Sequence, residues 1–331
     1  MLFSDISTYR LIAQRLADPS FSTPKQAVEW MGAMQAQDLQ MSLLGVALRA
    51  RDITIKEVEN ALGKGEILRT HLMRPTWHLV SADDIYWMLD LTAPALKRMS
   101  ATRNRQLELT DDIFHKSFTI LEKELQGKEL PREKITRILN AQGIKTDENR
   151  LSHILGMAEY EQLVCNGSVK GSKQNYALLA EKVPEKKTFS REESVLQLTE
   201  RFFQSHAPAT VADFAWWSFL PLKEIRWALE ELKNTFEKRE IENEVYYFPP
   251  ELTCQKIPKS SLHLLPAFDE FLVSYKSKNV CVPDEHRVKA ATMNGIFKPI
   301  IVQNGQIIGT WKKVSASKSV NIAVDFFEKE G

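Results

Sequence analysis

Apolar residues recur along most of the chain with the spacing of amphipathic helices, and short stretches of alternating polar and apolar residues interrupt them. A helix with one buried face repeats its apolar positions every three or four residues, whereas a half-buried strand repeats them at every second residue. The helical spacing predicts helices at 6–16, 111–125 and 190–206, among others. Alternation in EILRTHLM and PTWHLVS, on either side of Arg74-Pro75, predicts a β-hairpin.

Signals for the first turn of a helix stand in front of several of these segments. Thr23 precedes a proline, an arrangement typical of an N-cap followed by the first helical residue. Thr54 with Glu57, and Ser190 with Glu193, have the spacing of capping boxes, in which each side chain bonds the other residue's backbone N–H. These signals predict helices that open immediately after residues 23, 54 and 190.

Helical segments followed by a short hairpin occur three times, at 1–80, 81–183 and 188–250. The second hairpin is expected in VCNGSVKGSKQNYALL, and EVYYFPP supplies a strand for the third. Three helices with a two-stranded wing form the winged-helix variant of helix-turn-helix, whose natural partner is duplex DNA. Residues 251–331 are strand-like, with Asn304-Gly305 as a hairpin turn. We therefore predict a mostly helical α+β fold: three tandem winged-helix units and a C-terminal β-rich domain, a partial barrel.

The segment MGAMQAQDLQM places glutamines in an apolar neighbourhood. On a regular helix Gln35 and Gln37 would point about 200° apart, so their amides converge only if the helix ends or distorts between Ala36 and Asp38. Asp38 then caps a following helix that begins near Leu39. The pair either bonds local backbone groups at this junction or serves a functional site. The apolar stripe that leads to the junction is Ala27, Val28, Trp30, Met31 and Met34.

Composition is that of an ordinary soluble protein, with 43% hydrophobic and 26% charged residues. No apolar run approaches the roughly 18 residues of a membrane span, and the first residues lack the apolar core of a signal peptide. These features predict a cytoplasmic protein with no membrane partner. The three cysteines are scattered, and neither they nor the seven histidines show a metal-binding spacing. We therefore expect no metal and no cofactor.

The net charge is +1, so any DNA-binding surface must come from local clusters of basic residues. One such run lies at residues 91–107, which contain no acidic side chain. Other basic residues lie in short loops and in the first hairpin. For the run at 91–107 an ordinary solvated helix face is favoured over DNA contacts, and for His78 a structural role in the wing is favoured. The lysines of the short loops fit phosphate contacts or a solvated surface equally well. The candidate DNA-contacting residues are Arg69, Arg74, His78, Lys97, Arg98, Arg103, Arg105, Lys170, Lys173, Lys312 and Lys313.

Two further features are interpreted as structural. Trp216 and Trp217 in DFAWWSF favour a packing role, because paired tryptophans on a helix usually anchor a core. Asp269 in LLPAFDEF could be a catalytic acid, but its apolar surroundings favour a structural role.

Several long motifs resemble those of one family. They are MQAQD, RTHLMRPTWHLVSADD, DFAWWSF, LLPAFDEFLVSY and KPIIVQNGQIIGTWKK. The resemblance extends over close to the full 331 residues. The chain resembles the AlkZ-type winged-helix DNA glycosylases, a bacterial family with three tandem winged helices and a C-terminal β-rich domain. The family's active motif is glutamine, an apolar residue and a second glutamine, so the resemblance implies catalytic roles for Gln35 and Gln37. Ala36, the apolar residue of this motif, is smaller than many residues found at the same position in the family. The related YcaQ-like branch has aspartate in place of the second glutamine, so Gln37 favours the AlkZ-like branch.

The resemblance implies a monofunctional DNA glycosylase that hydrolyses the N-glycosidic bond of alkylated purines. A wider substrate range would include bulky or crosslinked adducts. Alkylation at N7 or N3 makes the base cationic and a good leaving group, so the enzyme need only place a water and stabilise a cationic sugar. An amide suits that task, because its oxygen accepts hydrogen bonds but is not a strong base. The expected partner is double-stranded DNA with alkylated bases, and the expected state, without a long coiled coil, is a monomer.

Two alternatives use the same sequence features. A non-catalytic DNA-binding protein or regulator could be built from tandem winged helices, although no dimerisation helix is evident and regulators usually pair to read two half-sites. A degenerate family member could bind damaged DNA without cutting it. Appearance of abasic sites at alkylated purines separates the enzyme from both.

Overall fold

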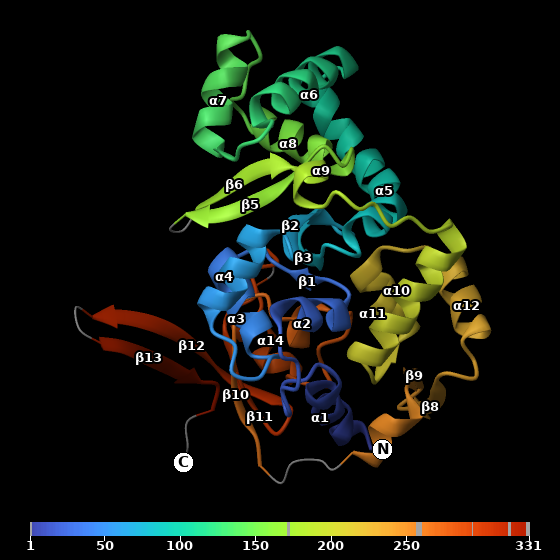
Figure 1. The fold of residues 1–331 in the computed structure, drawn as a ribbon. Coiled ribbons are helices and arrows are strands. Elements are labelled where there is room, and N and C mark those ends of the chain that lie inside the picture. The colour runs from blue at the N-terminus through green and yellow to red at the C-terminus, as the bar shows by residue number, and fades with distance from the viewer. Residues whose placement is uncertain (1, 171–172, 256–259, 293, 317–318, 329–331) are drawn as a thin grey trace. The chain divides into compact units, whose positions relative to one another are not determined.

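The computed structural model describes residues 2–170, 173–255, 260–292, 294–316 and 319–328 (Figure 1). The chain divides into two compact units. Unit 1 contains residues 1–54 and 195–331, and unit 2 contains residues 55–194. Unit 1 is thus assembled from two chain segments far apart in the sequence. The four domains expected from the sequence remain a prediction.

Unit 2 consists of helices around an antiparallel sheet. Its strands follow the order β3-β2-β5-β6-β4, and Arg69 of β2 lies opposite Asn166 of β5. The hairpins expected for the first two winged-helix modules therefore share one sheet. The helices are α4 (Ile55–Lys64), α5 (Ile85–Gln106), α6 (Asp111–Leu125), α7 (Arg132–Ala141), α8 (Arg150–Tyr160) and α9 (Leu179–Lys182). The strands are β2 (Ile67–Leu72), β3 (Thr76–Ser81), β4 (Leu130–Pro131), β5 (Val164–Lys170) and β6 (Lys173–Leu178).

The apolar positions of α6, α7 and α8 form a core with those of β5 and β6. Leu125, Leu139, Ile154 and Val164 are completely buried in it. Figure 1 shows the three helices grouped beside the β5–β6 hairpin. Each helix buries one stripe because its apolar residues recur at the helical period, which is the pattern that predicted these helices.

Unit 1 contains the glutamine segment and the remaining helices. Helix α10 begins in the last residues of unit 2 and continues into unit 1. Ser190 and Glu193 form the expected capping box at its start, with Ser190 Oγ accepting from Glu193 N at 3.2 Å. Thr23 Oγ1 likewise accepts from Gln26 N at 3.2 Å at the start of α2. The helices are α1 (Phe3–Ala13), α2 (Pro24–Met31), α3 (Leu39–Ala47), α10 (Arg191–Ser205), α11 (Val211–Ser218), α12 (Leu222–Glu231), the 3₁₀ helix η1 (Pro250–Cys254), α13 (Glu270–Val273) and α14 (Asp284–Ala290).

Short antiparallel sheets complete unit 1. One has the order β7-β9-β8, and the other has the order β10-β11-β12-β13, with the Asn304-Gly305 turn between β11 and β12 as expected. Within the described residues the second sheet is open, so it is not a barrel. The strands are β1 (Met34–Gln35), β7 (Ala209–Thr210), β8 (Glu237–Ile241), β9 (Glu244–Phe248), β10 (Leu262–Leu265), β11 (Ile300–Gln303), β12 (Gln306–Ala316) and β13 (Ser319–Phe326).

Two predictions about local structure are corrected. The stretch HLLPAFDEFLVSY, predicted to be strand-like, is a strand only to Leu265 and continues as helix α13, because Asp269 caps that helix by accepting from Phe271 N. Helix α2 ends at Met31, before the glutamines, because Gly32 at φ 74° takes a conformation that terminates a helix.

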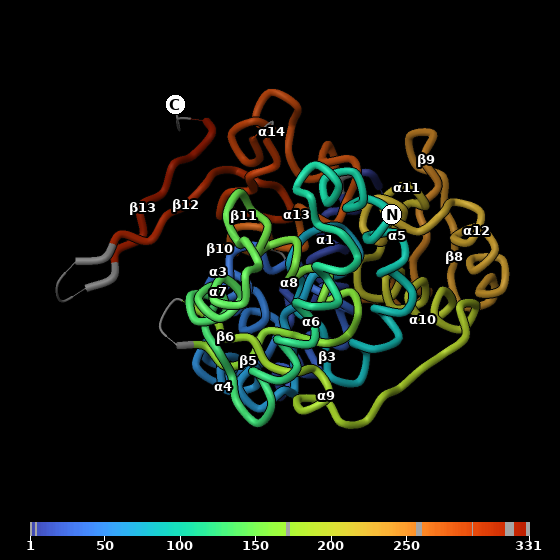
Figure 2. The backbone as a smooth tube through the Cα atoms, turned by 90° about the horizontal axis from the view of Figure 1, so that it is seen from above, coloured from blue at the N-terminus to red at the C-terminus, as the bar shows by residue number. Residues whose placement is uncertain are grey.

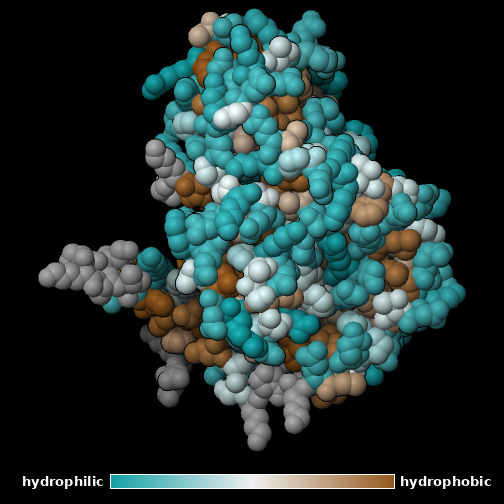
Figure 3. Space-filling model, viewed as in Figure 1, coloured by the Kyte–Doolittle hydropathy of each residue, from teal (hydrophilic) through white to brown (hydrophobic). Residues whose placement is uncertain are grey.

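Strands β12 and β13 extend together beyond the rest of their sheet (Figures 1 and 2). Apolar side chains of this hairpin lie exposed, among them Val314, Ile322 and Val324, and Figure 3 shows apolar spheres beside its grey end. Residues 317–318 lie outside the described part of the chain. No helix within the described ranges is long and apolar enough to cross a membrane.

Candidate functional site

The two glutamines lie on the short link between α2 and α3. Gln35 is the second residue of β1 and is 8% exposed, whereas Gln37 is exposed in the bend that follows. Asp38 caps α3, as predicted, by accepting from Met41 N at 3.1 Å. The link is therefore extended rather than helical, so the opposite phase that the two glutamines would have on a helix does not apply.

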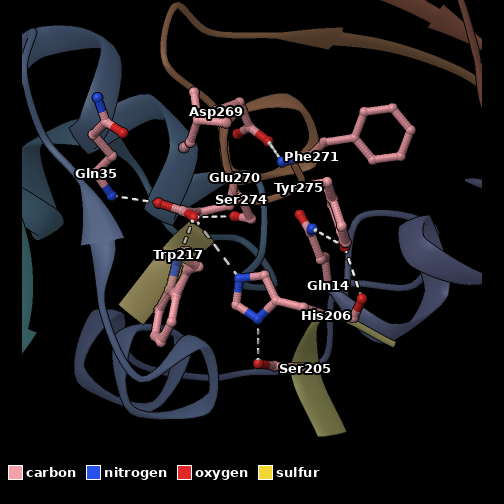
Figure 4. Close-up of polar contacts among 12 residues, drawn as sticks. Gln14, Gln35, Ser205, His206, Trp217, Asp269, Glu270, Phe271, Ser274 and Tyr275 are labelled. Carbon is pink, nitrogen blue, oxygen red and sulfur yellow. Dashed lines mark hydrogen bonds and ion pairs between the residues drawn. The ribbon is translucent and has the colours of Figure 1, made fainter. Parts of the chain in front are cut away.

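The backbone of Gln35 is held by a carboxylate. Its N–H donates to Oε1 of Glu270, the first residue of α13 (Figure 4). Glu270 is 1% exposed, and its other oxygen accepts from Trp217 Nε1 at 3.1 Å and from the Ser274 hydroxyl. Figure 4 shows these donors converging on the carboxylate, while the Gln35 side chain points away from it. One buried carboxylate thus joins the glutamine link to α11 and α13.

Glu270 is ionised despite its burial. Burial would raise the pKa of its carboxyl, but His206, the Ser274 hydroxyl and the Gln35 N–H favour the charged form and lower the pKa to about 2. The negative charge is therefore present throughout the neutral pH range. A buried charge is tolerated only where donors surround it, and these donors meet that requirement.

His206 and Ser205 extend the network on the far side of Glu270. His206 Nε2 lies 3.7 Å from Glu270 Oε2, and His206 Nδ1 lies 2.8 Å from Ser205 Oγ. The order Ser-His-Glu is that of a hydrolytic triad, but both Ser205 and His206 are completely buried, and the Ser205 hydroxyl donates to Arg201 O at 2.7 Å. Burial lowers the pKa of His206, and the Glu270 charge acts in the opposite direction. The arrangement fixes the core and offers no accessible nucleophile.

A second buried carboxylate, Asp269, pairs with Arg49. The guanidinium of Arg49 donates to both Asp269 oxygens at 2.9 Å, and it also donates to Gln14 Oε1 at 2.7 Å. Gln14 in turn donates to the Tyr275 hydroxyl at 3.0 Å. The predicted structural role of Asp269 agrees with this complete pairing. Asp269 and Arg49 thus tie the segment before α13 to the turn that follows α3.

Some predicted DNA-contacting residues are buried. His78 is completely buried on β3, with Nδ1 2.9 Å from Thr76 O, and Arg74 is 8% exposed. The complete burial of His78 conflicts with a direct phosphate contact by that residue. Arg74 is as exposed as Gln35, so its contact with DNA stays a prediction. Arg69 is half-buried, stacks 4.3 Å from the Trp77 ring and donates to Asn166 at 3.3 Å.

Five of the other candidates are exposed. Arg98, Arg103 and Arg105 are exposed on α5, and Lys312 and Lys313 are exposed on β12. Further candidates are in ion pairs or at a strand end: Lys97 pairs with Glu161 at 2.7 Å, Lys173 pairs with Glu133, and Lys170 is the last residue of β5.

Sequence reasoning missed Glu270, His206 and Ser274. The available signal was the acidic pair Asp269-Glu270 inside the apolar run LLPAFDEFLVSY, because acidic residues within a core are seldom without a partner. Trp217 is completely buried, as its predicted packing role requires, whereas Trp216 is 41% exposed. In the described residues no group of three or more His, Cys, Asp or Glu side chains is placed to hold a metal ion.

Comparisons with known proteins identify relatives over nearly the whole chain. A family model described as "DNA glycosylase AlkZ-like" matches residues 28–329. A curated relative from Streptomyces sahachiroi, named interstrand DNA cross-link repair glycosylase, is 23% identical over 336 residues, or 93% of this chain and 87% of the relative. The solved structure of S. sahachiroi DNA glycosylase AlkZ matches with a TM-score of 0.83 and 19% identity, over 100% of this chain and 92% of that chain. At this identity the structural match shows a shared fold.

Proposed function

Because the chain belongs to the AlkZ-like DNA glycosylase family, we propose that it is a monofunctional glycosylase that removes alkylated purines from double-stranded DNA. Its substrates are purines made cationic by alkylation at N7 or N3. Bulky and crosslinked adducts of the same kind belong to the proposed range, since the curated relative is named for interstrand cross-link repair.

The proposed reaction breaks the bond between C1′ of the sugar and the base nitrogen. The cationic base leaves with the electron pair of that bond and becomes neutral, while water adds its oxygen to C1′ and releases a proton to solvent. Gln35 and Gln37 hold this water and direct their amide oxygens at the developing positive charge on the sugar. The link that carries them contains no lysine, so no amine would form a covalent bond to the sugar and the product is an abasic site.

The observation that carries this proposal is the placement of the glutamine link. It joins two capped helices, its first glutamine is fixed through the backbone, and its second reaches the surface. A substrate approaching from solvent would therefore meet Gln37 first, while Gln35 remains in a fixed position behind it. Fixed dipoles stabilise a transition state without reorganising during the reaction.

The test measures release of 7-methylguanine from methylated duplex DNA, with alkali cleavage to reveal abasic sites. We expect Gln35→Ala and Gln37→Ala each to lower the rate on the order of 10²-fold, comparable to loss of one polar stabilising group. Gln40→Ala is the matched control, because Gln40 is an exposed glutamine in the first turn of α3. An unchanged rate in the double Gln35→Ala, Gln37→Ala variant contradicts the assignment. DNA binding without base release by the unaltered protein would favour the non-catalytic alternative.

A further inference from the structure

We propose that Glu270 is a positioning residue for the glycosylase reaction, acting through the backbone of Gln35. This inference rests on the proposed role of Gln35. It assigns to α13, in a part of the chain remote from the glutamines, the task of holding the glutamine link in its working geometry.

The first supporting observation is the kind of acceptor that Gln35 uses. Its buried backbone N–H donates to the side-chain carboxylate of Glu270. A buried N–H must find an acceptor, and one with a full negative charge forms a stronger and more directional bond than a neutral carbonyl. The position of the Gln35 backbone, and hence the starting point of its side chain, therefore depends on where Glu270 Oε1 lies.

The second observation is that Glu270 is itself fixed. Trp217 Nε1 and the Ser274 hydroxyl both donate to Oε2, which leaves Oε1 directed at Gln35. A carboxylate accepts at both oxygens, but an amide has one accepting and one donating end. Glutamine at position 270 would keep the size of the side chain. Its NH2 group would nevertheless face either the Gln35 N–H or the Trp217 N–H, and the link would shift.

A purely structural role for Glu270 would have a different consequence. In that case replacing Glu270 would lower the fraction of folded protein, and the folded molecules would keep the rate constant of the unaltered protein. A positioning role lowers the rate constant of the folded molecules, because displacement of a catalytic group by about 1 Å can cost on the order of 10²-fold in rate. Single-turnover kinetics with enzyme in excess separates these cases, since the amplitude reports active protein and the rate constant reports chemistry.

The experiment compares Glu270→Gln with Glu159→Gln. Glu159 is a matched control in unit 2: it is also completely buried, and it also accepts a backbone N–H, from His71 at 2.8 Å. Both variants are assayed on a duplex that carries one 7-methylguanine, at a temperature where circular dichroism shows them folded. We expect the rate constant to fall about 10- to 100-fold for Glu270→Gln and to stay within about threefold of the unaltered protein for Glu159→Gln, with duplex affinity unchanged in both.

A double-variant cycle adds a readout that a structural role would not move. If Glu270 acts through Gln35, then Glu270→Gln should slow the Gln35→Ala protein much less than it slows the unaltered protein. Should Glu270→Gln fail to fold, Trp217→Phe removes one donor that orients the carboxylate and keeps an aromatic ring in the core. We expect it to lower the rate constant in the same direction by a smaller factor.

The outcomes keep the two proposals apart. If Gln35→Ala retains the full rate, the proposed function of the glutamines fails. If Gln35→Ala is slow but Glu270→Gln keeps the full rate constant, or loses only amplitude, the positioning role alone is overturned. Equal effects of Glu270→Gln in the presence and absence of the Gln35 side chain would also overturn it.

Discussion

The backbone N–H of Gln35 donates to the buried carboxylate of Glu270, a residue 235 positions further along the chain. This contact joins β1, which lies in the short link between α2 and α3, to the start of α13. It shows that the geometry of the glutamine link is set by a distant part of unit 1 as well as by its neighbouring helices.

The charge of Glu270 should make the protein sensitive to acid. Its folded-state pKa of about 2 lies below its ordinary value of 4.5. The resulting stabilisation is complete above about pH 4.5 and is lost as the pH falls toward 2, because the unfolded chain takes up the proton first. Urea unfolding at pH 6 and pH 3 should show a smaller acid-induced loss of stability for Glu270→Gln than for the unaltered protein, by roughly 2 kcal/mol. Glu122→Gln, on the exposed face of α6, should lose as much stability as the unaltered protein.

The buried pair of Arg49 and Asp269 should be costly to break from one side. Arg49→Met leaves the Asp269 carboxylate in the core without its guanidinium, for an expected loss of roughly 3–5 kcal/mol in the free energy of unfolding. Lys56→Met removes an exposed partner of Glu59 and should cost less than about 1 kcal/mol. Equal midpoints for the two variants in urea would show that the buried pair contributes no more than a surface pair.

The basic end of α5 should contribute to DNA affinity through phosphate contacts. Arg103 and Arg105 are exposed there, and replacing both by alanine should weaken duplex binding at every sequence alike. If both arginines neutralise phosphates, the slope of log affinity against log salt should become about 2 less steep. Titrations by fluorescence anisotropy at several salt concentrations measure this slope. The control is Lys123→Ala on α6, and a slope that changes equally there would remove the special role of α5.

The turn between β11 and β12 should tolerate no side chain at Gly305. This residue has φ +81°, and a Cβ there would lie 2.6 Å from Ser7 Oγ and 2.8 Å from Thr8 N. Gly305→Ala therefore combines backbone strain with a clash against α1. Gly295 has a similar φ of +75° but open space around the Cβ position, so Gly295→Ala should cost only the strain, of order 1 kcal/mol. Thermal unfolding should show a distinctly larger drop in midpoint for Gly305→Ala, and equal drops would contradict the predicted clash.

The sequence by itself determined the local features of this protein. The capping signals at Thr23 and Ser190, the hairpin around Arg74-Pro75 and the Asn304-Gly305 turn all lie where their patterns predicted, because each depends on residues a few positions apart. The resemblance carried by the longer motifs pointed to the family that the comparisons then identified. The break at the glutamines was also expected, although Gly32 ends the helix earlier than helical phase suggested.

Only the tertiary structure decided which residues meet across long separations. Nothing in the local pattern links Gln35 to Glu270 or places His78 inside the protein, because hydrophobic periodicity gives the buried face of an element and not its partner. A histidine on a strand, or an acidic pair in an apolar run, has the same sequence pattern whether its side chain is exposed to solvent or buried with hydrogen-bonding partners. Packing of the two chain segments of unit 1 brings the Glu270 carboxylate to the Gln35 N–H, and a buried charge persists there because the folded chain surrounds it with donors.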